Sequence, residues 1–92
     1  MKVYTVSQIT GYIKKILEND ILLRDIYVEA EISNFKAHTS GHLYFTLKDS
    51  GAAINSVMFR SSAAKLKFMP ESGMKVVARG YISLYEKTGV YQ

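Results

Sequence analysis

The segment YVEAEISNFKAHTSGHLYFTLKDSGAAINSVMFR, residues Tyr27–Arg60, decides the fold of this chain. It contains three runs in which apolar and polar residues alternate, and a period of two is typical of half-buried β-strands. Two short turns separate the runs, and aromatic and basic residues gather at these bends. We therefore expect a three-stranded meander that forms the front sheet of a small barrel, with function on its solvent face.

The three expected strands are residues 26–33, 43–48 and 53–59. Asn34–Gly41 is expected to form the first loop. Asp49–Gly51 is expected to form a compact hairpin turn, in which the glycine can take a positive φ. In the third strand the apolar residues fit either phase, so periodicity leaves open whether Phe59 faces the core or the ligand.

The N-terminal part is expected to form a helix from about Val6 to Glu18. Apolar residues recur there at helical spacing, and Thr5 followed three residues later by Gln8 has the form of a capping box. Gly11 disfavours this helix by about 1 kcal/mol relative to alanine. We interpret the segment as a packing helix that caps the barrel.

The residues after the meander predict a short helix and a long, bent strand. Ser61 is expected to be the N-cap of the helix, which Pro70 ends. The strand runs from Met74 to Tyr85, and Gly80 in its middle indicates a bulge or bend. Val90–Gln92 opens a further strand that the chain does not complete, so we infer a fragment of a longer protein.

This order of elements predicts an all-β fold with flanking helices. It matches the five-stranded Greek-key OB-fold, here with a truncated fifth strand, an N-terminal helix and a short helix between strands three and four. Residues 1–92 would form a single domain, although small β-barrels of other topology fit the same order. OB-folds bind oligonucleotides or oligosaccharides between two loops, which here are Phe35–His42 and Glu86–Gly89.

Composition favours a polyanionic partner. Twelve Lys and Arg against eight Asp and Glu give a net charge of +4. The absence of cysteine excludes disulfides, thiolate metal sites and cysteine nucleophiles. No Gly-x-Ser-x-Gly elbow, phosphate-binding glycine loop or paired-carboxylate motif occurs. The chain also lacks a signal-peptide core and an apolar run of membrane-spanning length, so we expect a cytoplasmic domain with no membrane partner and no cofactor.

Aromatic rings and cations interleave along the expected strands, as stacking on unpaired bases requires. The first loop contains Phe35, Lys36, His38 and His42, and a solvated hairpin loop explains this composition equally well. Two histidines without a third and fourth donor at the usual spacing argue against a zinc site. The strands add the remaining residues of a groove for single strands: Tyr44, Lys48, Arg60, Arg79, Tyr81 and Tyr85.

The blocks ISNFK (32–36), SGHLYFTLKD (40–49) and VMFR (57–60) resemble the N-terminal domain of exodeoxyribonuclease VII large subunits. YTVSQITGYIKKIL before them and GMKVVARGYISLYEKTGVYQ after them extend the resemblance over essentially the whole chain. It implies an OB-fold that feeds single-stranded DNA to a downstream catalytic domain, which hydrolyses it from both ends into short oligonucleotides without a required metal. The positions that match the DNA-contacting segments of the family are Phe35, Lys36, His38, His42, Tyr44, Phe59 and Arg60.

The resemblance also implies that catalysis and small-subunit binding belong to other parts of the large subunit. The catalytic region is missing, so the 92 residues are expected to bind DNA and not to cleave it. The small subunit of the family assembles on regions of the large subunit that are absent here.

Two further functions fit the same residues. The edge left by a truncated fifth strand would suit a protein-interaction or self-association module. An oligosaccharide binder would use the same aromatic face, but its affinity would depend little on salt.

Overall fold

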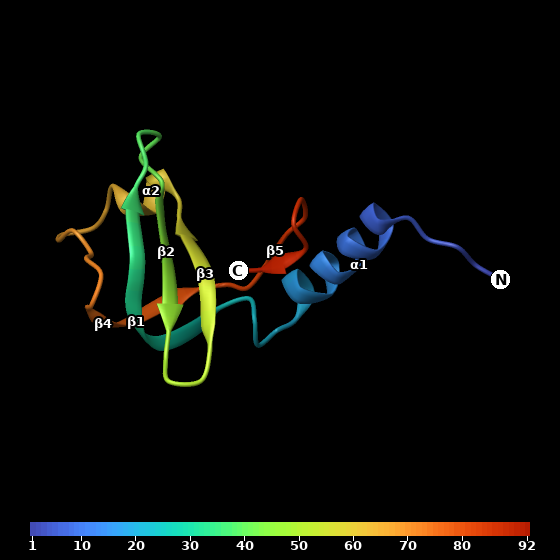
Figure 1. Cartoon of the computed structure of the whole chain (residues 1–92), viewed down its shortest axis with the longest axis horizontal. Helices are drawn as coiled ribbons and strands as arrows, with labels where there is room; N and C mark the ends of the chain where they lie inside the picture. The colour runs from blue at the N-terminus through green and yellow to red at the C-terminus, as the bar shows by residue number, and fades with distance from the viewer. The chain divides into compact units, whose positions relative to one another are not determined.

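The structure is a computed structural model that describes all residues, Met1–Gln92. Two compact units make up the chain: Met1–Tyr27 with Arg79–Gln92, termed the helical unit, and Val28–Ala78, termed the sheet unit. The elements, labelled in Figure 1 where there is room, are α1 (Val6–Asn19), β1 (Ile26–Ala37), β2 (Leu43–Lys48), β3 (Ala53–Met58), α2 (Arg60–Ala63), β4 (Lys75–Gly80), β5 (Leu84–Tyr85) and β6 (Val90–Tyr91).

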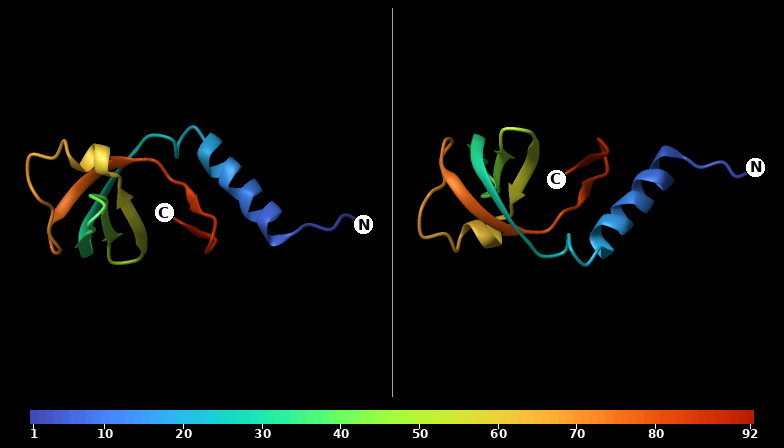
Figure 2. Two further views of the ribbon diagram at one scale, coloured as in Figure 1. Left: turned by 90° about the horizontal axis from the view of Figure 1, so that it is seen from above. Right: turned by 90° about the horizontal axis from the view of Figure 1, so that it is seen from below.

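Strands β1 to β4 form one sheet in the order β3-β2-β1-β4. The pairs β1-β2 and β2-β3 are antiparallel, which confirms the predicted meander. The strands twist strongly, as the two views of Figure 2 show, but β3 and β4 remain the two edges of an open sheet. The predicted fold class is therefore confirmed, whereas the five strands do not close into one barrel.

The register of the sheet defines its apolar face. Ile32 lies opposite Leu47, and Leu47 lies opposite Ile54 on the next strand. Four residues away on β2, Leu43 lies opposite Met58. The side chains of Ile32, Leu43 and Leu47 are only 4%, 4% and 7% exposed, so the predicted alternation of the first two strands is confirmed.

The same register settles the phase of the third strand. Because Ile54 and Met58 lie opposite core leucines, they belong to the apolar face. Val57 lies opposite Tyr44 and belongs to the other face. Phe59 follows the strand directly and is 49% exposed, so it does not fill the core.

Strand β1 is longer than predicted because of a β-bulge. The register shifts between Ser33 and Lys36, where Asn34 has a φ of 51°, in the left-handed region that few residues other than glycine adopt. The ring of Phe35 stacks on that of Phe45, with 6.4 Å between the centroids. The predicted Asn34–Gly41 loop is therefore wrong in its first half, since Phe35 and Lys36 are strand residues.

The positive φ expected at the glycine of the second hairpin turn occurs in the first turn instead. Gly41, in the first turn, takes a φ of 92°, while Gly51 is not among the glycines with positive φ. Instead, the carboxylate of Asp49 accepts hydrogen bonds from the backbone N–H groups of Gly51 at 2.8 Å and Ala52 at 2.9 Å. An aspartate side chain thus closes the second turn.

Helix α2 begins earlier than predicted. Its first residue is Arg60, and Phe59 occupies the N-cap position without a side-chain hydrogen bond to the helix. The predicted serine cap at Ser61 is therefore wrong. The consequence for the site is that Arg60 belongs to the helix and not to the end of the strand.

The predicted strand Met74–Tyr85 is two strands. β4 ends at Gly80, and the following backbone finds other partners: the N–H of Ile82 donates to the carbonyl of Leu23 at 2.9 Å. β5 then pairs with β6 in a separate two-stranded sheet. Glycine weakens a strand, and here Gly80 ends one strand instead of bending it.

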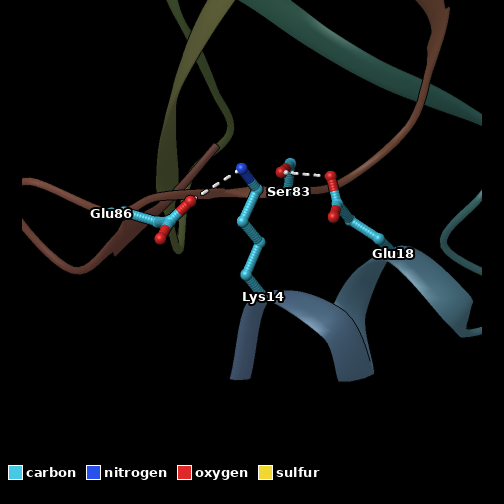
Figure 3. Close-up of polar contacts among 4 residues, drawn as sticks. All are labelled: Lys14, Glu18, Ser83 and Glu86. Carbon is cyan, nitrogen blue, oxygen red and sulfur yellow. Dashed lines mark hydrogen bonds and ion pairs between the residues drawn. The ribbon is translucent and has the colours of Figure 1, made fainter. Parts of the chain in front are cut away.

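Helix α1 closely matches its prediction and ends one residue later. The capping box is present, because the Thr5 hydroxyl accepts from the Gln8 N–H at 3.1 Å and the Gln8 side chain accepts from the Thr5 N–H at 2.8 Å. The helix contacts β5. Two polar contacts drawn in Figure 3 hold it there: Lys14–Glu86 at 2.9 Å and Ser83–Glu18 at 3.2 Å.

Candidate nucleic-acid interface

Most of the predicted site residues meet at one end of the sheet unit. The β1-β2 turn lies at the same end as α2, because β3 runs back toward that turn before the chain enters the helix (Figure 1). We term the side chains gathered there the hairpin patch: Lys36, His38, His42, Tyr44, Phe59 and Arg60.

His42 joins the turn to α2. Its Nδ1 accepts a hydrogen bond from the backbone N–H of Arg60 at 2.8 Å, so the neutral ring carries its proton on Nε2. The ring lies edge-on to Phe59, with 5.6 Å between centroids and 88° between planes. This is a favoured geometry for aromatic pairs, and it orients a phenyl ring that is half exposed.

His38 orients Tyr44 in a similar way. Its Nδ1 accepts from the backbone N–H of Ser40 at 3.0 Å and lies 2.9 Å from the hydroxyl of the same residue. Its ring is edge-on to Tyr44, with centroids 6.0 Å apart and planes at 84°. Tyr44 is 44% exposed and lies opposite Lys36 in the β1-β2 register, so a ring and a cation are neighbours.

The cations of the hairpin patch have no carboxylate partner. The ion pairs of the structure are Lys14–Glu86, Lys48–Glu31 and Arg79–Asp25, and neither Lys36 nor Arg60 takes part in one. Gly41 leaves room for the stem of Arg60, since a Cβ at this glycine would lie 2.9 Å from the Cγ of the arginine. Unpaired surface cations are free to neutralise phosphates.

The patch does not include every predicted residue of the sheet unit. Phe35 is half-buried beside Phe45, an apolar-face residue of β2. Lys48 lies at the opposite end of β2 from the turn, and its Nζ is 3.6 Å from a carboxylate oxygen of Glu31. A nucleic acid would have to displace Glu31 to use this lysine.

Arg79 and Tyr85 belong to the helical unit. The Arg79 guanidinium donates two hydrogen bonds to the Asp25 carboxylate, at 2.9 and 2.8 Å, and lies 5.7 Å from the ring centroid of Tyr27. The hydrogen bond and charge of each partner lower the pKa of Asp25 and raise the pKa of Arg79. Arg79 is therefore already neutralised, and Tyr85 stays an exposed residue of β5.

The segment after α2 was missed by the sequence analysis. Leu66, Lys67, Phe68 and Met69 line a groove of about 490 Å³ together with parts of the first turn and α2. Phe68 and Met69 are 58% and 60% exposed. Lys67 beside the large apolar pair was the signal, but the run was interpreted as part of a short helix that Pro70 ends.

The structure contains neither a cluster of metal-binding side chains nor a membrane-spanning helix. No three of its His, Asp and Glu side chains are grouped closely enough to hold a metal ion. None of its helices combines the length and the apolar character needed to cross a membrane.

Comparisons with known proteins identify the family of the chain. The chain is 59% identical over 92 residues to the exodeoxyribonuclease 7 large subunit of Clostridium kluyveri, and 54% identical over 92 residues to those of Alkaliphilus metalliredigens and Clostridium acetobutylicum. Each match covers 100% of this chain but only 22% or 23% of the relative. The family model for the OB-fold nucleic acid binding domain matches residues 4–92. The chain belongs to this family of OB-fold nucleic-acid-binding domains.

Proposed function

We propose that the chain binds single-stranded DNA through the hairpin patch. The observation that carries the proposal is the pairing of exposed rings with unpaired cations at one end of the sheet: Tyr44 beside Lys36, and Phe59 beside Arg60. Rings stack on any base, and cations neutralise the phosphates between the bases.

The geometry favours an unpaired strand over a duplex. The bases of a single strand have free π-faces that can stack on Tyr44 and Phe59, whereas those of a duplex are already stacked. We expect little preference for particular DNA sequences, because stacking contacts the faces of the bases and not the edges that distinguish them.

The experiment is a fluorescence anisotropy titration of the chain with labelled oligo-dT, with the matched duplex and with a neutral oligosaccharide, each at two salt concentrations. We expect binding to oligo-dT that is stronger than binding to the duplex and that weakens steeply as salt rises. Binding that is equal at both salt concentrations would contradict the proposal. Tighter binding to the oligosaccharide would favour the carbohydrate alternative.

We also propose that this domain is the DNA-binding module of an exodeoxyribonuclease VII large subunit, a cytoplasmic enzyme that acts with a small subunit. The full-length identity to proteins of that name supports this role, while the chain spans less than a quarter of their length. The 92 residues should therefore bind labelled single strands without shortening them. Degradation by the purified chain alone would contradict this division of labour.

Self-association is a second candidate function, and one observation favours it. β3 is an edge of the sheet, so its outer backbone groups are available to a strand from another molecule. A mass that rises with concentration in light scattering would support this function. A constant monomer mass would contradict it.

A further inference from the structure

The groove beside α2 is an open apolar surface next to the hairpin patch. Its volume of about 490 Å³ falls within the range of sites that bind small molecules. Leu43 in its lining is buried, whereas Phe68 and Met69 are more than half exposed. The apolar residues that line it are Ala37, Leu43, Ala63, Ala64, Leu66, Phe68 and Met69.

The charge of the groove selects a class of occupant. Arg60, Lys67 and His38 line it, and no carboxylate does. A second depression of the sheet unit is lined by Glu29, Glu31 and Asp49 together with two lysines, so its charge is mixed. An occupant of the α2 groove must therefore combine an apolar body with negative charge, as a nucleotide does.

We propose that the groove takes one unstacked base of the strand held at the hairpin patch, while its flanking phosphates contact Arg60 and Lys67. This inference rests on the proposed function. Arg60 connects the two surfaces, since its backbone N–H bonds to His42 of the patch and its side chain lines the groove. A strand that stacks on Phe59 meets the adjacent Arg60 and then the groove.

The test combines photocrosslinking with a variant that fills the groove. Oligo-dT with one 4-thiothymidine is crosslinked to the chain, and the modified peptide is identified by mass spectrometry. Ala64→Phe places a ring in the groove, and Ala53→Phe is its matched control at another exposed alanine, on β3 and outside the groove. Circular dichroism checks that both variants fold.

We expect crosslinks at Phe68 or Met69. Ala64→Phe should weaken oligo-dT binding by about fivefold or more, the value of one lost base contact, while Ala53→Phe should leave it unchanged. If Ala64→Phe does not fold, the position of the crosslink in the parent chain tests the inference by itself.

Two results would overturn the inference, and they are distinguishable. Crosslinks confined to Tyr44 and Phe59, with Ala64→Phe binding like the parent chain, would show that the groove binds no base and would leave the proposed function intact. A parent chain that does not bind oligo-dT at all would contradict both the proposed function and the inference about the groove.

Discussion

Arg60 and Arg79 carry the same guanidinium group, and the sequence placed both at a nucleic-acid surface, but their surroundings differ. Arg60 lies at the hairpin patch without a carboxylate partner. Arg79, in the helical unit, is held by Asp25 through two hydrogen bonds and by the ring of Tyr27. A cation must therefore be considered together with its ion-pair partners before it is assigned to a ligand.

The same distinction applies to the whole chain. Its net charge of +4 does not show which cations lack a carboxylate partner. Lys14, Lys48 and Arg79 are each paired with a carboxylate, whereas Lys36 and Arg60 are not. Phosphates would compete with a local carboxylate at the first three positions and with water and salt ions alone at the other two.

The largest effect is expected from removing a ring of the patch. Tyr44→Ala should weaken oligo-dT binding by about 5- to 150-fold, because one stacked base is worth about 1–3 kcal/mol. Tyr12→Ala is the control, since Tyr12 is 65% exposed on α1 and has no place in the patch. Anisotropy titrations measure both. An equal loss of oligo-dT affinity in the two variants would mean that stacking is not specific to the hairpin patch.

A smaller effect is expected from freeing a paired cation. Glu31→Gln removes the partner of Lys48 and should strengthen binding at low salt, with a log–log salt slope steeper by at most about 0.7. Glu29→Gln removes the same charge from a carboxylate that pairs with no cation. Equal strengthening of binding by the two variants would contradict the claim that Glu31 occupies Lys48.

The smallest effect concerns stability and pH in the helical unit. The hydrogen bond and charge of Arg79 lower the pKa of Asp25 below its ordinary value of 3.8. The ionised carboxylate therefore contributes stability that is present above 3.8 and is lost as pH falls through the lowered pKa.

Thermal unfolding of the parent chain and of Asp25→Asn measures this contribution. The difference in Tm should be small at neutral pH, because the pair is exposed, and should vanish in strong acid. A difference that grows as the solution is acidified would contradict the sign of the linkage.

Local patterns in the sequence predicted the fold well. The alternation in β1 and β2, the capping box at Thr5 and the order of the elements all follow from interactions within a few residues or across one hairpin. The end of β4 at Gly80 could not be predicted in this way, because the backbone beyond it forms a hydrogen bond with Leu23, far away in sequence. The bulge at Asn34 was also invisible, since it depends on how the strand pairs.

The candidate site was predicted in part for the same reason. The residues of the patch lie near the turn in sequence, so the composition of the expected loop pointed to them, but the bulge in β1 is what places Lys36 opposite Tyr44. The hydrogen bond from Arg60 to His42 joins residues 18 apart and required the structure. Pairing is equally non-local: Arg79 and Asp25 are 54 residues apart, and no local pattern showed that this arginine was occupied.

The most direct test of the central claim is the salt dependence of oligo-dT binding by the parent chain, Arg60→Ala and Arg79→Ala. Thermal unfolding first checks that all three are folded. Removing Arg60 should make the slope of log K against log salt shallower by about 0.7, as one phosphate contact is lost, while removing Arg79 should leave the slope unchanged. Equal slopes for the parent chain and Arg60→Ala, or a change only in Arg79→Ala, would contradict the claim that unpaired cations of the hairpin patch hold the strand.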